Sequence, residues 1–157
     1  MSLSKVKEYF KKYNLDNRII ELKTSSATVK EAAESLHTEE SQIAKTLSFL
    51  VNNKPILIVT SGDTKIDNSK FKSLFHEKAH MIPADLVNEY IGHEIGGVCP
   101  FAINENVDVY FDESLKRFSY VYPACGSSNS AIKLSIEELE KYTNYQEWID
   151  VCKNNNN

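Results

Sequence analysis

The residues with the greatest chemical potential lie in one glycine-rich run. Residues 92–101 read GHEIGGVCPF, with three glycines and a proline among apolar residues. Glycine permits positive φ and close approach to the backbone, whereas proline fixes φ and removes one N–H donor. Such a run predicts a rigid loop whose N–H groups face an anion or a reacting carbonyl oxygen. A tight turn explains the same composition, and neither G-x-G-x-x-G nor G-x-x-x-x-G-K-[ST] is present.

A lysine and a second small loop add to this candidate site. Lys45 begins an apolar stretch that ends at Val51, so a strand is expected to hold it. Lysine at a strand start is commonly a solvated edge residue, but its ammonium is also a point charge suited to phosphate. Residues 124–130, ACGSSNS, supply N–H groups and hydroxyls, although this composition is also typical of simple turns. Together, the lysine and the two loops favour a ligand site.

Nucleophile and metal patterns are weak in this chain. Cys99 with His93 as its base is one arrangement for a thiol hydrolase, but a buried, inert cysteine is the commoner role, also for Cys125. His76 and His80 are four residues apart, yet no carboxylate partner accompanies them. The three cysteines are odd in number and widely spaced, which gives no disulfide framework. We therefore expect no metal site and no cofactor.

Composition limits the class of protein. With 157 residues, 41% of them hydrophobic and 25% charged, the chain is expected to form one domain with a sizeable core. The net charge of −4 argues against a strongly basic nucleic-acid surface, although residues 65–80 are either a solvated basic helix face or a contact for RNA. The longest apolar runs are far shorter than a membrane span, and the charged start shows no signal peptide. We expect a cytoplasmic protein without membrane or DNA contacts.

Apolar periodicity and capping patterns predict the elements that position these residues. Helices are expected over 4–14, from Thr28 to about Leu36, after Asp67, over 86–91 and after Ser135; strands over 18–22, 45–51, 56–61, 107–111, 119–122 and 131–134. Residues 52–55 indicate a hairpin, and Gly92 occupies the C′ position of a helix. The helix after Asp67 is expected to bury Phe71, Leu74 and Phe75. Interleaved strands and helices with a hairpin predict an α+β (mixed α/β) fold rather than a doubly wound parallel sheet.

Several segments, in matching order, resemble the YbaK and prolyl-tRNA-synthetase-associated editing domains, a group that includes Cys-tRNA(Pro) deacylase-like and EbsC-like proteins. Gly96 to Pro100 is similar to the family's G-x-x-x-P loop. The other similar segments are 28–33 (TVKEAA), 42–47 (QIAKTL), 61–67 (SGDTKID), 124–127 (ACGS) and 134–139 (LSIEEL). The resemblance spans about residues 20–145. One departure is Ala102, which stands where many relatives carry a glycine.

The resemblance implies a curved, mainly antiparallel sheet flanked by helices. We expect one editing domain over residues 1–153, with residues 1–17 as an N-terminal helix region and the polar residues 154–157 as a disordered tail. Carried over by position, Lys45 orients the terminal adenosine of a tRNA. Gly96 and Gly97, in a turn held by Pro100, are expected to place N–H groups near the aminoacyl carbonyl. The expected substrate contacts are Val98, Cys99, Phe101, Gly126, Ser127 and Ser128.

The family resemblance predicts a trans-acting aminoacyl-tRNA deacylase, with tRNA(Pro) carrying cysteine or alanine as the expected substrate. The acceptor end of the tRNA is the expected partner, and prolyl-tRNA synthetase is a second candidate partner. The family implies no protein nucleophile, because a ribose hydroxyl and a water do that work. Two alternatives stay open: a non-catalytic tRNA- or synthetase-binding module, motivated by the acidic balance, and a Cys99-dependent thiol hydrolase.

Overall fold

The structure, a computed structural model, describes residues 2–155. Its helices are α1 (Ser2–Lys11), α2 (Val29–Leu36), α3 (Asn68–Phe75), α4 (Val87–Ile91) and α5 (Ile136–Lys141). Short 3₁₀ segments are η1 (Asp16–Arg18), η2 (Glu40–Gln42), η3 (Ala84–Leu86) and η4 (Glu113–Arg117). The strands are β1 (Ile19–Glu21), β2 (Ile43–Val51), β3 (Lys54–Ser61), β4 (Thr64–Ile66), β5 (Asp108–Asp112), β6 (Tyr120–Pro123), β7 (Ser130–Ile132), β8 (Leu134–Ser135), β9 (Glu147–Ile149) and β10 (Cys152–Asn154).

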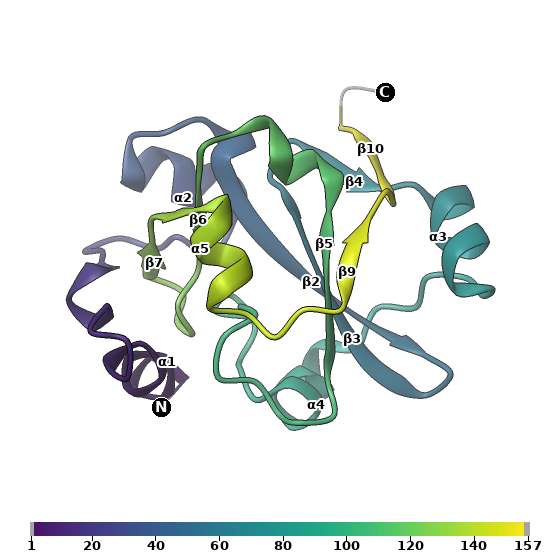
Figure 1. The fold of residues 1–157 in the computed structure, drawn as a ribbon, viewed down its shortest axis with the longest axis horizontal. Coiled ribbons are helices and arrows are strands. Elements are labelled where there is room, and N and C mark those ends of the chain that lie inside the picture. Colours follow the sequence, from purple (N-terminus) through teal and green to yellow (C-terminus); the bar gives the residue numbers. More distant parts are fainter. Residues whose placement is uncertain (1, 156–157) are drawn as a thin grey trace.

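A six-stranded curved sheet in the order β8-β6-β2-β3-β5-β9 forms the centre of the fold (Figure 1). Its longest ladder is the predicted hairpin, in which β2 pairs antiparallel with β3 over Ala44–Val51. Asn52 and Asn53 at the hairpin tip have φ of 52° and 63°, the left-handed geometry of a tight hairpin turn. The β6–β8, β1–β7 and β4–β10 pairs are also antiparallel, whereas β2–β6, β3–β5 and β5–β9 are parallel. The predicted α+β fold with a mainly antiparallel sheet is confirmed.

Strand β3 is buried on both faces because its side chains alternate between two apolar layers. Leu57 and Val59 belong to the larger layer, which also takes in Phe10 from α1. Ile58 points to the opposite face, into a layer with Phe71 from α3. In Figure 1, α1 and α2 lie to the left of the sheet and α3 to the right, so helices flank it on both sides.

Both predicted capping boxes are present and define the starts of α2 and α5. The N–H of Glu31 donates to the Thr28 hydroxyl at 3.1 Å, and the Thr28 N–H donates back to the Glu31 carboxylate at 3.3 Å. The same reciprocal pair joins Ser135 and Glu138 at 3.1 and 2.9 Å. Gly92 ends α4 with φ of 99°, as its C′ position predicts.

The C-terminal segment differs from the predicted disordered tail. Strand β10 pairs antiparallel with β4, and the N–H of Asn155 donates to the Asp63 carbonyl at 3.1 Å. Asn154 and Asn155 are therefore held by the fold, and the prediction for 154–157 is wrong for these two residues. Residues 156–157, like Met1, lie outside the described part of the chain.

The structure differs from the prediction at Leu74 and gives a physical reason for the glycine that many relatives carry at the position of Ala102. Leu74 is 39% exposed, so the inner face of α3 consists of Phe71 and Phe75 without it. Ala102 has φ of 55°, the left-handed region that an alanine occupies at a cost of about 1–2 kcal/mol. A glycine suits this backbone conformation better, which gives a physical reason for glycine at this position.

The ion pair between Arg18 and Glu138 ties η1 to the start of α5, at 2.7 Å between Nη1 and Oε2. Hydrogen bonding to the Arg18 guanidinium lowers the pKa of Glu138 from 4.5 to about 2. A lowered carboxyl pKa stabilises the fold above the unfolded pKa, and this contribution disappears as the pH falls through the folded pKa. Because both side chains are about one third exposed, we expect about 1 kcal/mol from the pair.

We therefore expect Glu138→Gln to unfold with about 1 kcal/mol less free energy than the wild type at about pH 7, and with a much smaller difference at about pH 2, where the carboxyl is half protonated. Glutamine preserves the capping box, so the substitution isolates the charge. Urea titrations at several pH values measure the difference. A deficit that is the same at every pH would show that the charge of Glu138 is not its source.

Candidate active site

A pocket of about 460 Å³ lies along an open stretch of the β2 edge. Strand β6 pairs with β2 only as far as Ala44, and segment 80–82 covers the same edge only from Ser48 onward. Between these two points no strand from residues 2–155 pairs with the main-chain groups at this edge. Such an edge offers N–H and C=O groups to a ligand.

The pocket walls are mostly apolar and come from both faces of the sheet. The apolar residues that line it include Val29 and Leu36 from α2, Tyr122 from β6, and also Ile82, Val87 and Val98. Met81 and Ile95, which are 59% and 58% exposed, also line the pocket and thus form part of its rim. The volume and the apolar lining are those of a site for a small ligand.

Lys45 enters the pocket lining from β2 with a half-buried side chain. Burial lowers the pKa of its ammonium, and the neighbouring Asp63 carboxylate partly offsets this effect. Its Nζ donates to the Thr64 carbonyl and forms no ion pair within residues 2–155. The ammonium is partly desolvated and has three N–H groups, of which this bond uses one. Such a cation is suited to bind a phosphate oxygen.

The glycine-rich loop meets two other loops beside the pocket. Gly96 has φ of 90°, and a Cβ there would lie 3.3 Å from the Cβ of Ser128 and 3.4 Å from the Cβ of Ala27. The N–H of Ser26 donates to the Ser128 carbonyl, which joins the segment before α2 to the loop before β7. Gly96 and Val98 line the pocket, which places this part of the glycine-rich loop at the candidate site.

Gly97 serves loop packing in this structure. Its N–H donates to the Glu94 carbonyl at 3.1 Å, and a Cβ would lie 2.5 Å from the backbone of Gly126 and Ser127. In this conformation the Gly97 N–H already has an acceptor, so it is not available to an aminoacyl carbonyl. Gly97 instead lets the two glycine-bearing loops touch.

A family model described as Aminoacyl-tRNA editing domain matches residues 23–142 of the chain. The chain belongs to this family. This editing domain is 51% identical over 154 residues to the uncharacterised protein YwhH of Bacillus subtilis (strain 168), covering 98% of each. It is 33% identical over 95 residues to the proline–tRNA ligase of Limosilactobacillus fermentum (strain NBRC 3956 / LMG 18251), covering 57% of this chain and 17% of the ligase.

Solved structures show the same fold. One, described as a proposed trans-editing enzyme for prolyl-tRNA synthetase, superposes with a TM-score of 0.86 at 28% identity and covers 97% of each chain. Another, the hypothetical protein APE2540, superposes with a TM-score of 0.83 at 31% identity, over 95% of this chain and 99% of the other. The editing-domain fold therefore extends over nearly the whole chain.

Other predicted site residues of the editing domain do not line the pocket. They are Cys99, Pro100, Phe101, Gly126, Ser127 and Ser128. After Val98 the chain turns into the core, where the Phe101 ring packs edge-on against Phe10 at 4.7 Å between centroids. The second loop instead reaches the pocket through its two ends, Ala124 and Ser130.

Cys99 and His93 are close together but fully buried. The Cys99 Sγ lies 3.5 Å from Nε2 of His93, and the same Nε2 lies 2.6 Å from the Phe101 carbonyl oxygen. Because a carbonyl only accepts, we assign the ring proton to Nε2, which then has no lone pair for the thiol. Burial raises the pKa of Cys99 to about 12 and lowers the pKa of His93. The geometry argues against a thiol nucleophile.

The described part of the editing domain has few other chemical centres. Among residues 2–155, no group of three or more His, Cys, Asp or Glu side chains is placed to hold a metal ion. In the same range no helix is both long and apolar enough to cross a membrane.

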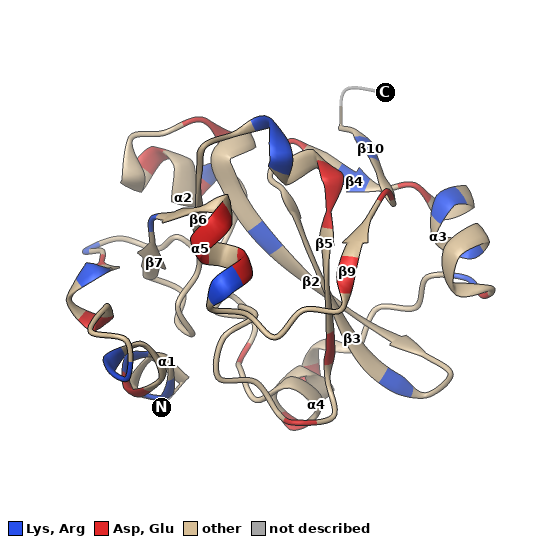
Figure 2. Cartoon of the chain, viewed as in Figure 1, with Lys and Arg blue, Asp and Glu red and all other residues tan. Residues whose placement is uncertain are grey.

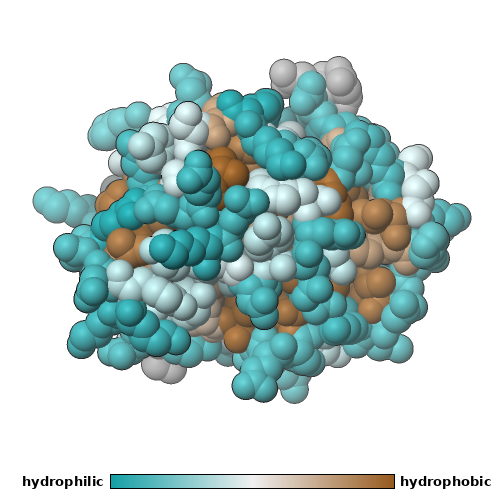
Figure 3. Space-filling view, in the orientation of Figure 1, coloured by the Kyte–Doolittle hydropathy of each residue, from teal (hydrophilic) through white to brown (hydrophobic). Residues whose placement is uncertain are grey.

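Charged residues of both signs are interspersed in Figure 2, and Lys70 in the basic stretch pairs with Asp150 at 2.9 Å. Figure 3 shows a mostly polar face with separate apolar patches.

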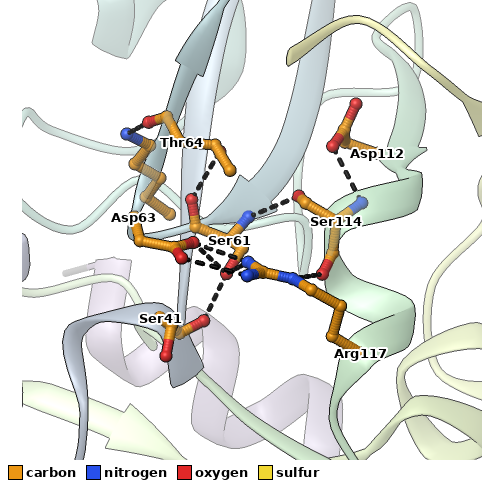
Figure 4. Close-up of polar contacts among 8 residues, drawn as sticks. Ser41, Ser61, Asp63, Thr64, Asp112, Ser114 and Arg117 are labelled. Atoms are coloured by element: carbon orange, nitrogen blue, oxygen red, sulfur yellow. Dashed lines mark hydrogen bonds and ion pairs between the residues drawn. The ribbon is translucent and has the colours of Figure 1, made fainter. Parts of the chain in front are cut away.

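A polar network surrounds the turn between β3 and β4 (Figure 4). The two terminal nitrogens of Arg117 donate to the two carboxylate oxygens of Asp63, at 3.0 and 2.6 Å. Arg117 also donates to the Ser61 hydroxyl at 2.8 Å. These bonds to Arg117 lower the pKa of Asp63. Residues 61–67 are among the segments that resemble the editing-domain family, but nothing in the sequence indicates a contact with Arg117, which lies more than fifty residues away.

Proposed function

We propose that this domain hydrolyses the ester bond of mischarged tRNA, acting in trans in the cytoplasm. The observation that carries the proposal is the Lys45 ammonium, free of any ion pair within residues 2–155, beside an apolar pocket at an open strand edge. Membership of the aminoacyl-tRNA editing family supports the reaction class. The likeness to a proposed trans-editing enzyme supports action as a separate protein.

Lys45 binds a phosphate oxygen at the acceptor end, and the amino acid side chain enters the apolar pocket. Gly96 and Val98 line that pocket, so their N–H groups are the main-chain donors proposed for the ester carbonyl. Water adds to the carbonyl carbon, the bond to the ribose oxygen breaks, and that oxygen leaves with a proton. Among the described residues that line the pocket there is no His, Asp or Glu, so the substrate's own ribose hydroxyl is proposed to relay the proton.

Positioning and an oxyanion donor are sufficient for this reaction because an ester is already activated. Fixing the reacting groups contributes up to about 7–11 kcal/mol, and one oxyanion donor about 2.7–4 kcal/mol. A mostly apolar pocket favours a small apolar or weakly polar side chain. Alanine and cysteine on tRNA(Pro) are the proposed substrates, supported by the similarity to a segment of proline–tRNA ligase. Discrimination between them is modest, since one methylene is worth about 1–3 kcal/mol.

A panel of aminoacyl-tRNAs tests this function. We expect release of alanine or cysteine from tRNA(Pro) well above the rate in buffer, and little release of proline. Serine on tRNA(Pro), and alanine and cysteine on their own tRNAs, separate amino-acid from tRNA selection. Tight tRNA binding without hydrolysis anywhere in the panel would support a non-catalytic module instead.

The Cys99→Ala variant separates the proposed mechanism from a thiol hydrolase. Because Cys99 is buried and does not line the pocket, we expect kcat/KM for deacylation to stay within about 3-fold of the wild type. The lost packing costs about 1 kcal/mol of folding free energy. Single-turnover deacylation and thermal unfolding measure the two effects. A loss of activity much larger than the loss of stability explains would restore Cys99 as a nucleophile.

A further inference from the structure

We propose that Asp63 and Arg117 are positioning residues for Lys45, acting through the turn between β3 and β4. The inference rests on the proposed function, because it concerns the cation that binds substrate. The Lys45 ammonium donates a hydrogen bond to the Thr64 carbonyl, at the end of this turn. The position of the turn therefore determines the position of the ammonium.

The turn between β3 and β4 packs closely against η2 and contains an internal hydrogen bond. The Thr64 hydroxyl donates to the Ser61 carbonyl at 2.7 Å, which closes the turn. A Cβ at Gly62 would lie 2.1 Å from the Glu40 carbonyl oxygen, so the backbone there leaves no space for a side chain. The Ser61 hydroxyl also donates to the Ser41 carbonyl. These contacts fix the turn on the η2 side.

Arg117 fixes the same turn from the side of η4 (Figure 4). Its guanidinium donates to both carboxylate oxygens of Asp63. This planar two-point contact fixes both the orientation of the carboxylate and its distance from Arg117. Segment η4 is itself anchored, because the Ser114 N–H donates to Asp112 at 2.9 Å and the Ser114 hydroxyl accepts from the Ser61 N–H at 3.1 Å. The guanidinium therefore links a capped 3₁₀ segment to the turn that holds Lys45.

Charge gives the network a second effect on Lys45. Burial disfavours the ammonium, whereas the Asp63 carboxylate in the turn, which is paired with Arg117, favours it. Cys152 in β10, beside Asp112, also faces this region, but burial raises the pKa of its thiol to about 12, so the thiol is neutral where Lys45 titrates. Removal of the Asp63 charge lowers the pKa of Lys45, and the ammonium then loses its proton at lower pH.

A purely structural ion pair would have a different signature. The Arg117 and Asp63 side chains are 44% and 36% exposed, and exposed pairs contribute little to stability. Such a pair would change neither the pH dependence of the reaction nor the titration of Lys45. A matched control is the Lys116–Glu113 pair on the same 3₁₀ segment, with exposures of 47% and 46%.

The experiment compares Asp63→Asn, Arg117→Ala, Arg117→Lys and the control Lys116→Ala in single-turnover deacylation across pH. We expect Arg117→Ala to reduce kcat/KM by about 10-fold or more through misplacement of the ammonium, with partial recovery in Arg117→Lys. For Asp63→Asn we expect the alkaline limb of the rate profile to move to lower pH. Lys116→Ala is expected to match the wild type.

Titration of Lys45 by NMR, after isotopic dimethylation of lysines, gives a readout independent of activity. A lower Lys45 pKa in Asp63→Asn supports the inference even if the wild type hydrolyses no aminoacyl-tRNA, an outcome that would remove the proposed function alone. An unchanged Lys45 pKa together with an unchanged rate profile would overturn the inference. Equal losses in Arg117→Ala and Lys116→Ala would also overturn it.

Discussion

Lys45→Met is expected to reduce kcat/KM for deacylation by about 100-fold while the protein stays folded. A hydrogen bond to a charged group contributes about 1.5–3 kcal/mol, which corresponds to as much as about 150-fold in rate. Methionine keeps an unbranched side chain of similar length, so the packing of the stem in the pocket wall is retained. Removal of a partly desolvated charge offsets the loss of its hydrogen bond to the Thr64 carbonyl, so stability is expected to change little.

The matched control for this variant is Lys54→Met, which removes a lysine from β3 whose side chain is 52% exposed and paired with Asp108. We expect wild-type rates for that control. Lys45→Arg keeps the charge but changes its shape, and we expect it to recover only part of the activity. Full activity of Lys45→Met would show that the ammonium does not contact the substrate.

Gly97→Ala is expected to lower the free energy of unfolding by about 1–3 kcal/mol and to reduce deacylation at the same time. The added Cβ would meet the carbonyl carbon of Gly126 and the amide nitrogen of Ser127 at 2.5 Å. Both contacts are backbone atoms, so one of the two loops must move as a unit. Because Gly96 and Val98 in that run line the pocket, a loop shift also misplaces the pocket wall.

Gly96→Ala is the comparison for this effect. There the two atoms nearest to the added Cβ would be side-chain carbons at 3.3 and 3.4 Å, and the strain comes from the positive φ of 90°. We expect a loss of about 1–2 kcal/mol from this backbone strain. Urea unfolding of the two variants measures the difference. If Gly97→Ala were as stable as the wild type, the tight contact between the loops would not hold in solution.

Local sequence signals predicted most of the fold. The capping boxes at Thr28 and Ser135 depend on residues three positions apart, and the 52–55 hairpin depends on adjacent turn residues. Strands β4, β9 and β10 have only three residues each and form through pairing with distant segments. Cys152 lies opposite Ile66, and no periodicity in either segment indicates that partner. Leu74 follows the helical pattern but faces outward at the end of the last turn of α3.

The candidate site was predicted only where the chemistry is local. Lys45, Gly96 and Val98 line the pocket, because an apolar strand and a glycine-rich loop are readable from neighbouring residues. The role of Gly97 depends on a contact with Gly126. The proposed positioning of Lys45 depends on the contact between Arg117 and Asp63. Contacts between segments so far apart are fixed by the packing of the whole domain, which single positions do not reveal.

Hydrolysis of Cys-tRNA(Pro) and Ala-tRNA(Pro) in single turnover, with wild type, Lys45→Met and buffer side by side, tests most directly whether the β2-edge pocket is an editing site. We predict rapid release of the amino acid by the wild type and release about 100-fold slower with Lys45→Met. Equal rates with wild-type protein and with buffer, on every mischarged tRNA(Pro) tested, would contradict an editing function for this pocket.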